Sequence, residues 1–305
     1  MLLKRILQTT LALTVALATA TSTAHAQAAE EGQRQLLFYN HAYSVVDRET
    51  ADAIENSAYL REFANFEVRT TTGGGITWKG RYLKGRETYV ELFAEGDLPG
   101  QDAEFGSAGM AVSTERVGDL ATVTQRLQDK GIAPVPYRQT RDFGDGVPVP
   151  WFDTIRTFSD PYDAFDGWSM EYCQEYFADP RSDTEPESYP GDVSRERYLP
   201  DAYQDHSMRD ITGIRIAVTE RDLANTVPLL KAGGFNVKSR SGGIVASGGG
   251  TTIRLDSVPR EQAGLRQIDF ALNQPIAAQH KEQIGRSTLT VGPGSRAVWS
   301  FDGKK

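Results

Sequence analysis

The amino-acid sequence predicts an α+β protein in which one unit, a strand, a helix and then three strands, recurs along the chain. Two observations predict it. Apolar strand-like runs that lead through a turn into an amphipathic helix occur at 36–66, 109–131 and 214–234, with a weaker start at 265–272. These helices are followed by strand candidates and not by further helices. The units therefore form two pairs in tandem, which agrees with the two domains suggested by a length of 305 residues.

The first unit begins with an apolar and aromatic run at residues 36–46. Asp47 is expected to cap the following helix, because its side-chain oxygen can accept a hydrogen bond from a free backbone N–H. Ile54, Tyr59, Phe63 and Phe66 then fall near helical spacing. Three strand candidates, separated by glycines that favour tight turns, follow at 66–72, 76–83 and 88–93.

The second and third units follow the same plan. The second places Leu120, Val123 and Leu127 on one helix face, and its strand candidates lie at 135–143, 151–158 and 168–176. In the third unit, Thr219 and Asp222 resemble a capping box. Pro228 inside this third helix is unfavourable, because proline removes a backbone hydrogen bond and crowds the preceding turn.

Composition predicts where the two pairs join. Residues 178–208 are rich in Pro, Asp, Glu, Ser and Tyr, which predicts an exposed connector. We therefore expect a first module pair at 27–177 and a second, degenerate pair at 209–305.

The first 26 residues have the pattern of a cleavable signal peptide. Lys4 and Arg5 precede an uncharged apolar run, and Ala24-His25-Ala26 supplies a small-residue cleavage site. The apolar run is shorter than the roughly 20 residues that span a bilayer, which argues against a retained membrane anchor. We expect cleavage after Ala26 and a periplasmic or secreted protein. Removing two cations changes the formal charge from −8 to −8 − 2 = −10.

Composition excludes several classes of function. The acidic balance argues against a nucleic-acid partner, and no later apolar run predicts a membrane span. A single cysteine, Cys173, excludes a disulfide framework or a multi-cysteine metal site. His206 and His280 lie in polar stretches and are expected to face solvent, whereas His41 lies in a strand-like run. We expect the partner to be a small-molecule substrate, and the protein to be a monomer or a homodimer.

The motifs and their order resemble the vicinal oxygen chelate superfamily, which includes glyoxalase I, extradiol dioxygenases and bleomycin-resistance proteins. The first pair reads F-Y-N-H-A-Y-S-V-V-D at 38–47, T-Y-V-E-L-F at 88–93 and G-S-A-G-M-A-V-S-T-E at 106–115, similar to glyoxalase-like proteins. The resemblance covers residues 35–177 well and 210–301 loosely. It implies paired modules that form open, cupped mixed sheets, with one divalent metal ion inside.

In this superfamily the metal ligands come from the first and fourth strands of each unit. Carried onto this sequence, the resemblance implies His41 and Glu91 from the first unit and Glu171 from the second. The remaining position falls at about Ser107, where relatives with four protein ligands have a histidine or another donor. An imidazole and two carboxylates suit Fe, Mn, Zn, Co or Ni.

Strand alternation is compatible with this ligand set. It places Glu91 on one face with Tyr89 and Phe93, and Glu171 on one face with Ser169. An inward carboxylate is costly unless it binds a partner such as a metal ion. The alternative is that these carboxylates face solvent on the other side of the sheet, or pair with arginines such as Arg69 or Arg81.

The resemblance implies a metal-dependent isomerase, epimerase or lyase. The metal would chelate two neighbouring oxygens of a small substrate and stabilise an enolate or oxyanion, and Glu171 or Glu91 would move the proton. The residues expected to contact substrate are Tyr43, Trp78, Tyr82, Ser107 and Trp151. Two alternatives are a metal-free protein of the same fold that binds or sequesters small molecules, and a scaffold whose second half exists mainly to bury the first.

Overall fold

The structure is a computed structural model that describes residues 34–73 and 75–303. From residue 36 onwards, the described residues form one compact unit. The signal peptide expected at residues 1–26 lies outside the described residues. Within those residues, no helix has the length and apolar character needed to cross a bilayer.

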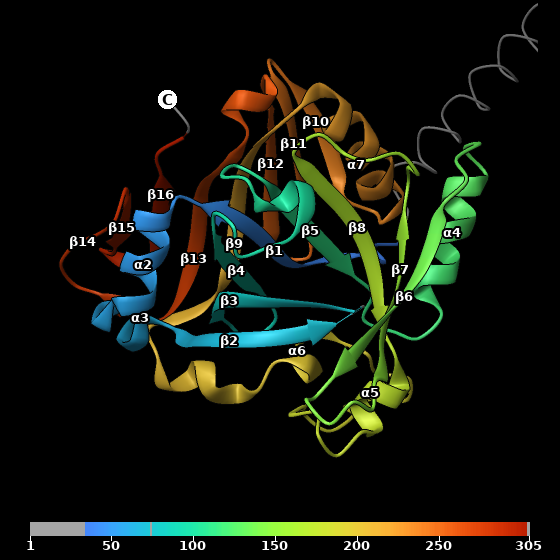
Figure 1. Cartoon of the computed structure of the whole chain (residues 1–305), viewed down its shortest axis with the longest axis horizontal. Coiled ribbons are helices and arrows are strands. Elements are labelled where there is room, and N and C mark those ends of the chain that lie inside the picture. The colour runs from blue at the N-terminus through green and yellow to red at the C-terminus, as the bar shows by residue number, and fades with distance from the viewer. Residues whose placement is uncertain (1–33, 74, 304–305) are drawn as a thin grey trace, which may run out of the picture. The chain divides into compact units, whose positions relative to one another are not determined.

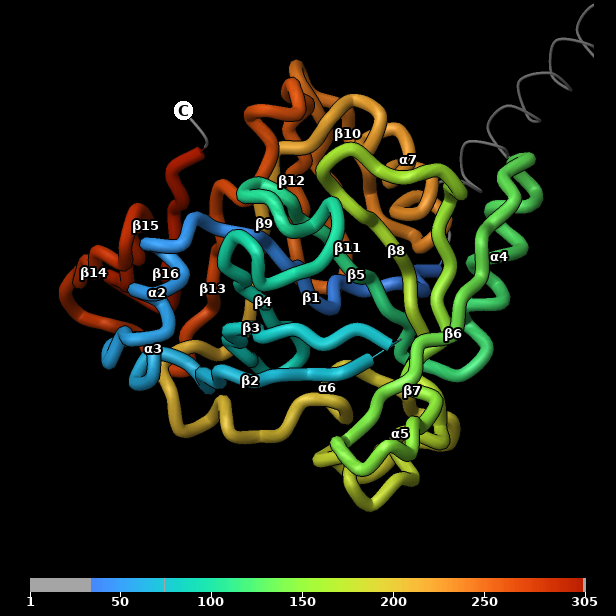
Figure 2. The backbone as a smooth tube through the Cα atoms, viewed as in Figure 1, coloured from blue at the N-terminus to red at the C-terminus, as the bar shows by residue number. Residues whose placement is uncertain are grey.

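Eight strands of the first module pair close into a barrel in the order β1-β4-β3-β2-β6-β7-β8-β5 (Figure 1). The strands are β1 Phe38–Val46, β2 Asn65–Gly73, β3 Ile76–Lys84, β4 Tyr89–Ala94, β5 Ala108–Ser113, β6 Val135–Asp142, β7 Val149–Arg156 and β8 Phe165–Tyr172. The two modules join where β1 pairs antiparallel with β5. On the opposite side β2 and β6 pair through only two residues each, so the sheet closes there by a short contact (Figure 2).

The first helix begins where its capping residue predicts. Asp47 accepts a hydrogen bond from the backbone N–H of Thr50, as expected, and starts the first helix. A second cap, Ser57, then divides the predicted first helix into two. The α-helices are α2 Arg48–Asn56, α3 Ala58–Phe63, α4 Asp119–Gln128, α5 Gln174–Ala178, α6 Arg195–Tyr198 and α7 Glu220–Ala232, and the 3₁₀ turns are η1 Gly100–Ala103, η2 Asp201–Asp205 and η3 Arg260–Gln262.

The second module pair forms an open eight-stranded sheet in the order β10-β11-β12-β9-β13-β16-β15-β14. Its strands are β9 Met208–Val218, β10 Asn236–Arg240, β11 Gly243–Gly248, β12 Thr251–Ser257, β13 Gly264–Ile276, β14 His280–Ile284, β15 Ser287–Val291 and β16 Gly294–Phe301. The first three modules have a crossover helix, and their first and last strands are parallel. The fourth module has no α-helix between β13 and β14 to carry the chain back along the sheet. Its first and last strands, β13 and β16, are therefore antiparallel.

Helix α7 of the second pair braces the barrel. It lies against β8 (Figure 1), and a Cβ at Gly167 of β8 would approach the Thr226 hydroxyl to 2.7 Å. The fully buried Asp222 carboxylate accepts hydrogen bonds from the backbone N–H groups of 163, 164 and 165 at 2.8–3.0 Å. Thr219 caps α7 as predicted, but the Asp222 side chain turns to the barrel and holds the start of β8.

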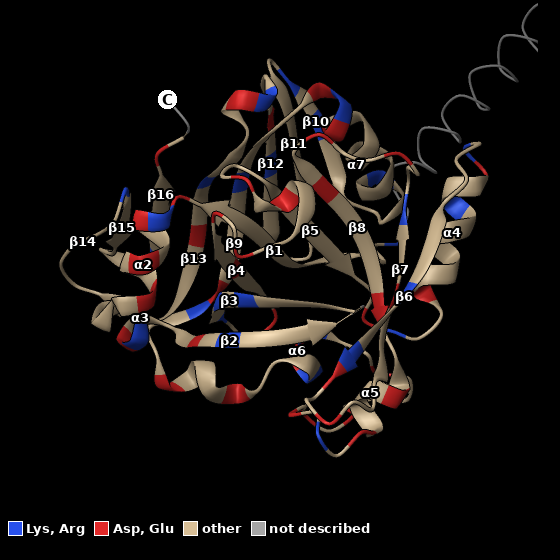
Figure 3. Ribbon diagram, viewed as in Figure 1, with Lys and Arg blue, Asp and Glu red and all other residues tan. Residues whose placement is uncertain are grey.

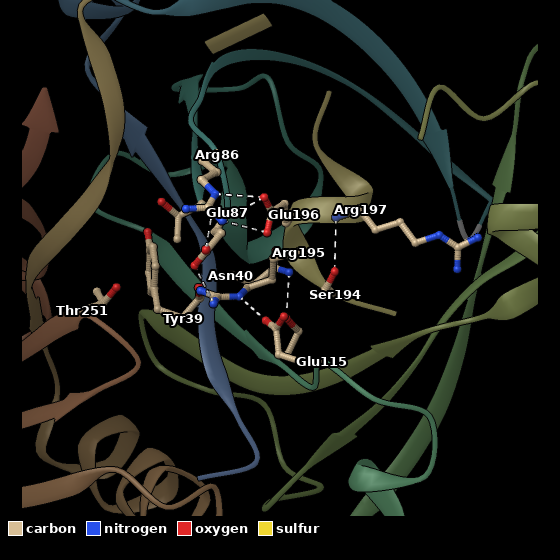
Figure 4. A network of polar contacts seen from close by, with 12 residues as sticks. Tyr39, Asn40, Arg86, Glu87, Glu115, Ser194, Arg195, Glu196, Arg197 and Thr251 are labelled. Atoms are coloured by element: carbon tan, nitrogen blue, oxygen red, sulfur yellow. Dashed lines mark hydrogen bonds and ion pairs between the residues drawn. The ribbon is translucent and has the colours of Figure 1, made fainter. Parts of the chain in front are cut away.

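The segment expected to be an exposed connector is partly buried, and that expectation is corrected. Arg195 is 4% exposed and forms ion pairs with Glu87 and Glu115 at 3.0 and 2.5 Å (Figure 4). Its guanidinium also donates to the backbone carbonyl of Tyr39 at 2.7 Å. One buried cation therefore fastens the segment to β1, to the turn between β3 and β4, and to the chain after β5.

Replacing Asp222 should destabilise the protein strongly. Asp222→Ala leaves three backbone N–H groups at the start of β8 without their carboxylate acceptor, so we expect a loss of about 3 kcal/mol in the free energy of unfolding. Urea unfolding followed by circular dichroism measures it. Glu220→Ala, an exposed carboxylate on the same helix, should cost less than about 1 kcal/mol. Equal losses in the two variants would contradict the bracing role.

Candidate functional site

The barrel interior holds a cavity of about 390 Å³. Side chains from β1, β3, β4, β6, β7 and β8 line it, because alternate residues of each strand face inward. Half of its lining residues are aromatic: Tyr43, Trp78, Tyr89, Phe93, Tyr137, Trp151, Phe152, Tyr162, Trp168 and Tyr172. Its ionisable lining consists of His41, Glu91, Asp102, Asp166 and Arg156 together with the tyrosine hydroxyls. This is the size and character of a small-molecule site.

His41 lies in this cavity as a neutral imidazole. Its ring stacks on Tyr89 with 4.4 Å between centroids, and its Nδ1 lies 2.7 Å from Oδ1 of Asn40. The β1–β5 pairing shifts its register between Tyr39 and His41, at the position of Asn40. The Asn40 amide donates to the hydroxyls of Ser113 and Tyr172, so its oxygen is the acceptor for Nδ1–H of His41. Burial lowers the pKa of His41 to about 3, which leaves Nε2 as a neutral acceptor at physiological pH.

Glu91 also lines the cavity, and among the described residues no side chain or backbone group forms a hydrogen bond with its carboxyl. In the parallel β1–β4 ladder Glu91 lies opposite Tyr43, two residues along from the pair of His41 with Tyr89. Burial raises the pKa of Glu91 to about 7, and the nearby Arg69 cation opposes this shift. A partly buried carboxyl of this pKa can hold or release a proton near neutrality.

The structure does not bring Glu171 to this site, so the three predicted metal ligands do not meet in one cavity. Glu171 accepts hydrogen bonds from the backbone N–H groups of Gly118 and Leu120 at 2.9 and 3.0 Å, and from the Thr114 hydroxyl at 3.1 Å. It thus satisfies the free N-terminus of α4, outside the barrel. The neighbouring residues of β8, Met170 and Tyr172, are the ones that face the cavity.

Strand register identifies the true second-module counterparts of His41 and Glu91. The β1–β5 ladder pairs His41 with Ala111, and Tyr43 with Gly109, so it is symmetric about the pair of Ala42 and Met110. By this symmetry Gly109 corresponds to His41. The same symmetry makes Ala111 the counterpart of Tyr43. Since Tyr43 pairs with Glu91 and Ala111 pairs with Trp168, Trp168 is the counterpart of Glu91.

Neither counterpart is a metal ligand. At Gly109 a Cβ would lie 2.2 Å from the Tyr43 ring and 2.9 Å from that of Trp168, so those rings fill the space that a second ligand would need. Ser107, expected at this position, lies outside the cavity lining, and its hydroxyl donates to the Gln101 carbonyl.

The residues present therefore do not fit the metal ion that the resemblance implies. His41 and Glu91 supply one imidazole and one carboxylate, and the described residues contain no group of three His, Cys, Asp or Glu side chains arranged to hold an ion. Catalytic sites for the metals considered commonly use three protein ligands.

Three of the five residues expected to contact substrate line the cavity: Tyr43, Trp78 and Trp151. Tyr82 does not, because it lies behind Trp78 and accepts a hydrogen bond from the Trp78 indole at 3.1 Å. It lines a separate, smaller cavity instead. Ser107 is the second expected substrate-contact residue that does not line the cavity.

Sequence reasoning missed a polar cluster at the cavity wall. The Tyr43 and Tyr162 hydroxyls donate to the two oxygens of Asp102 at 3.1 and 2.6 Å. Asp166 pairs with Arg156 at 2.5 Å, while its second oxygen, Oδ1, is buried without a hydrogen-bond partner in the structure. Burial raises the pKa of Asp166 to about 6 and also raises that of Asp102. Asp102 and Tyr162 lie outside the strands, where periodicity gives no signal, but the alternation of Asp166 with Trp168 and Met170 could have indicated it.

The remaining candidates lie outside the cavity lining. His280 is exposed against Tyr59, and His206 lies near the Glu62 carbonyl. Cys173 is buried, as expected, and burial raises the pKa of its thiol to about 11. A thiol of this pKa stays protonated at neutral pH and is a poor nucleophile.

The paired modules, joined through their first strands around a central cavity, have the fold of the vicinal oxygen chelate superfamily, as the sequence resemblance predicted. Within that fold class, the model of a family described as "Family of unknown function (DUF5829)" matches residues 39–301. The chain therefore belongs to this family. A search of curated proteins gives no match.

Several solved structures align with most of this chain at low sequence identity. A hypothetical protein from Staphylococcus aureus is 9% identical, with 85% of this chain and 99% of that chain covered at a TM-score of 0.52. The 2,3-dioxygenase LapB from Pseudomonas sp. KL28 is 13% identical, with 86% and 91% covered at 0.43. The Mn(II)-bound glyoxalase from Novosphingobium aromaticivorans is 10% identical, with 86% and 80% covered at 0.37. The likeness to the Staphylococcus aureus protein concerns the fold alone.

The pKa of Glu91 predicts a pH-dependent stability. Because the folded-state pKa is raised from 4.5 to about 7, the folded protein binds more protons than the unfolded chain between these values. Stability should therefore fall as pH rises through this window, by up to about 1.4 kcal/mol per pH unit. Glu91→Gln removes this pH dependence. Between pH 5 and pH 8, the free energy of unfolding of the variant should therefore rise by about 1–3 kcal/mol relative to that of the wild type.

Urea unfolding at pH 5, 6, 7 and 8 measures the effect. The control is Glu95→Gln, an exposed carboxylate directly after β4, which should leave the pH profile unchanged. A Glu91→Gln profile parallel to that of the wild type would show that Glu91 is ionised at its ordinary pKa.

Proposed function

We propose that this protein binds a small organic molecule in the barrel cavity, and that the ligand has a flat apolar body and a basic nitrogen. Glu91 carries the proposal, because it is a cavity-lining carboxyl without a hydrogen-bond partner among the described residues. A ligand that donates a proton or a positive charge to this group would supply the missing interaction.

The rest of the lining supports a cationic ligand. Three carboxyl groups, Glu91, Asp102 and Asp166, face the cavity with one cation, Arg156. Asp102 already accepts two tyrosine hydroxyls and Asp166 is paired with Arg156, so Glu91 is the group left for the ligand. The aromatic walls add to the attraction, since ring faces are negative and bind cations at about 0.5–2 kcal/mol each.

A matched ligand series tests this proposal. 2-Naphthylmethylamine, 2-naphthalenemethanol and 2-naphthoate share one ring system and differ in charge. We expect the amine to bind at least tenfold more tightly than the naphthoate, because it pairs with Glu91 and naphthoate is repelled. Quenching of tryptophan fluorescence measures the affinities, since Trp78, Trp151 and Trp168 line the cavity. Amine affinity should rise from pH 6 to pH 8 as Glu91 ionises.

Two variants locate the interaction. Glu91→Gln should weaken amine binding about tenfold, equivalent to about 1.4 kcal/mol, and leave the alcohol nearly unaffected. Glu171→Gln, the carboxylate at the α4 N-terminus, should leave both affinities unchanged. Equal binding of amine and naphthoate, or an unchanged affinity in Glu91→Gln, would refute the proposal.

A second candidate is proton-transfer catalysis by Glu91, favoured by its pKa of about 7 beside a neutral imidazole. A carboxyl poised near neutrality can remove a proton next to a carbonyl and return it, which is isomerase or epimerase chemistry. His41 would orient the substrate through Nε2, the acceptor left by its Nδ1–H bond to Asn40.

Hydrogen exchange tests this candidate. In D₂O, the protein should exchange the α-protons of hydroxy-ketones at a rate that rises with pH to a plateau above about 7, because only ionised Glu91 is a base. Proton NMR follows the loss of signal. Glu91→Gln should reduce the rate at least a hundredfold, whereas a rate equal to the wild type would exclude Glu91 as the base.

We also propose that the protein acts after export. The charged start, apolar run and cleavage pattern of residues 1–26 support this. Sequencing of the exported chain should begin at Gln27, and a chain recovered only from the cytoplasm with its first residues intact would contradict it.

A further inference from the structure

A second cavity, of about 130 Å³, lies beside the first and is built from different chemistry. Four of its lining residues are cations, and its one lining carboxylate, Asp183, is exposed. Its walls come from β2, β3, β4 and β6 and from the segment that contains α5 and α6, and the basic segments of β2, β3 and β6 are visible in Figure 3. The cationic lining residues are Arg69, Lys84, Arg141 and Arg181.

Arg141 is the central feature of this cavity. Its guanidinium lies 4.7 Å from the ring centroid of Phe143, 5.4 Å from that of Trp151 and 5.8 Å from that of Tyr176, and it donates to the Tyr176 hydroxyl at 2.5 Å. No carboxylate of the described residues forms a salt bridge with it, unlike the other three lining cations. A guanidinium has five N–H donors, so Arg141 keeps donors for a further acceptor.

The neighbouring cations differ in how fully nearby carboxylates neutralise their charge. Arg69 lies over the Tyr82 ring and meets Glu67 only at 3.4 Å, while Lys84 holds the same carboxylate at 2.9 Å. Lys84 and Arg69 thus share the Glu67 carboxylate. The further carboxyl near Arg69 is Glu91 of the larger cavity, whose pKa is raised to about 7, so it neutralises Arg69 only in part and positive charge remains in excess. Arg181 is paired with both Asp145 and Asp179, so it adds little to this excess.

We propose that this cavity is an oxyanion site that takes a phosphate or carboxylate group, with Arg141 and Arg69 as its principal ligands and Lys84 as a supporting cation. Planar guanidinium groups match the geometry of both anions and are held in place here by stacked aromatic rings, so little freedom is lost on binding. The hydroxyls of Tyr176 and Tyr198 line the same space. The site is separate from the acidic cavity, and the two share only Tyr89 among their lining residues.

Titration of the purified full chain with inorganic phosphate tests this proposal, with sodium chloride adjusted to hold ionic strength constant. Tryptophan fluorescence reports binding, because Trp151 lies against Arg141. We expect a saturable change that Arg141→Gln weakens at least tenfold and Lys84→Gln weakens about twofold to fivefold. A parallel titration with acetate distinguishes a phosphate from a carboxylate ligand: the anion that binds more tightly at equal ionic strength identifies the group.

The matched control is Arg138→Gln. Arg138 lies on the same strand, is exposed, and pairs with Asp153 outside the cavity lining, so this variant should bind as the wild type does. Absence of saturable binding of both anions, or equal loss in Arg138→Gln and Arg141→Gln, would overturn the proposal. Should Arg141→Gln fail to fold, as circular dichroism would show, Lys84→Gln decides, and an unchanged phosphate affinity in that variant would refute the site.

Discussion

The alternation of side chains around a closed barrel is the constraint on which the rest of this structure depends. In β8, Met170 and Tyr172 face the cavity and the intervening Glu171 faces α4. The same rule, applied to β1 and β4, places His41 and Glu91 inside. A shift of one residue would exchange the two faces of a strand, so register decides which carboxyl is available for chemistry and which one only caps a helix.

The barrel does not hold this register by itself. Its closing contact between β2 and β6 is short, and the start of β8 is fixed by Asp222, a carboxylate from the second module pair. Arg195 fastens the linking segment to β1 and to the loops around it. The second pair therefore braces the barrel at the start of β8.

Two adjacent cavities of opposite character result from this arrangement. In the larger one, aromatic rings surround three carboxyl groups, and Gly109 and Trp168 occupy the positions where a second module would supply metal ligands. In the smaller one, aromatic rings hold guanidinium groups. Removal from water raises the pKa of Glu91 in the larger cavity. In the smaller one, the rings of Phe143, Trp151 and Tyr176 hold the Arg141 guanidinium in a fixed position before any anion binds.

The unit of the fold and the helix caps at Asp47 and Thr219 could be predicted from the sequence, because hydrophobic period and capping chemistry are local properties. The presence of His41 and Glu91 on the first and fourth strands could be predicted in the same way. The outward orientation of Glu171 could not be predicted in this way, because the residues that flank Glu91 and Glu171 are similar in character. Only the pairing of β5 with β8 decides which face of the sheet the Glu171 side chain occupies. Nor did the sequence reveal Asp102, Tyr162 or the Arg141 cavity. Those groups come from loops and distant strands, and only tertiary packing brings them within hydrogen-bonding distance of one another or into one cavity.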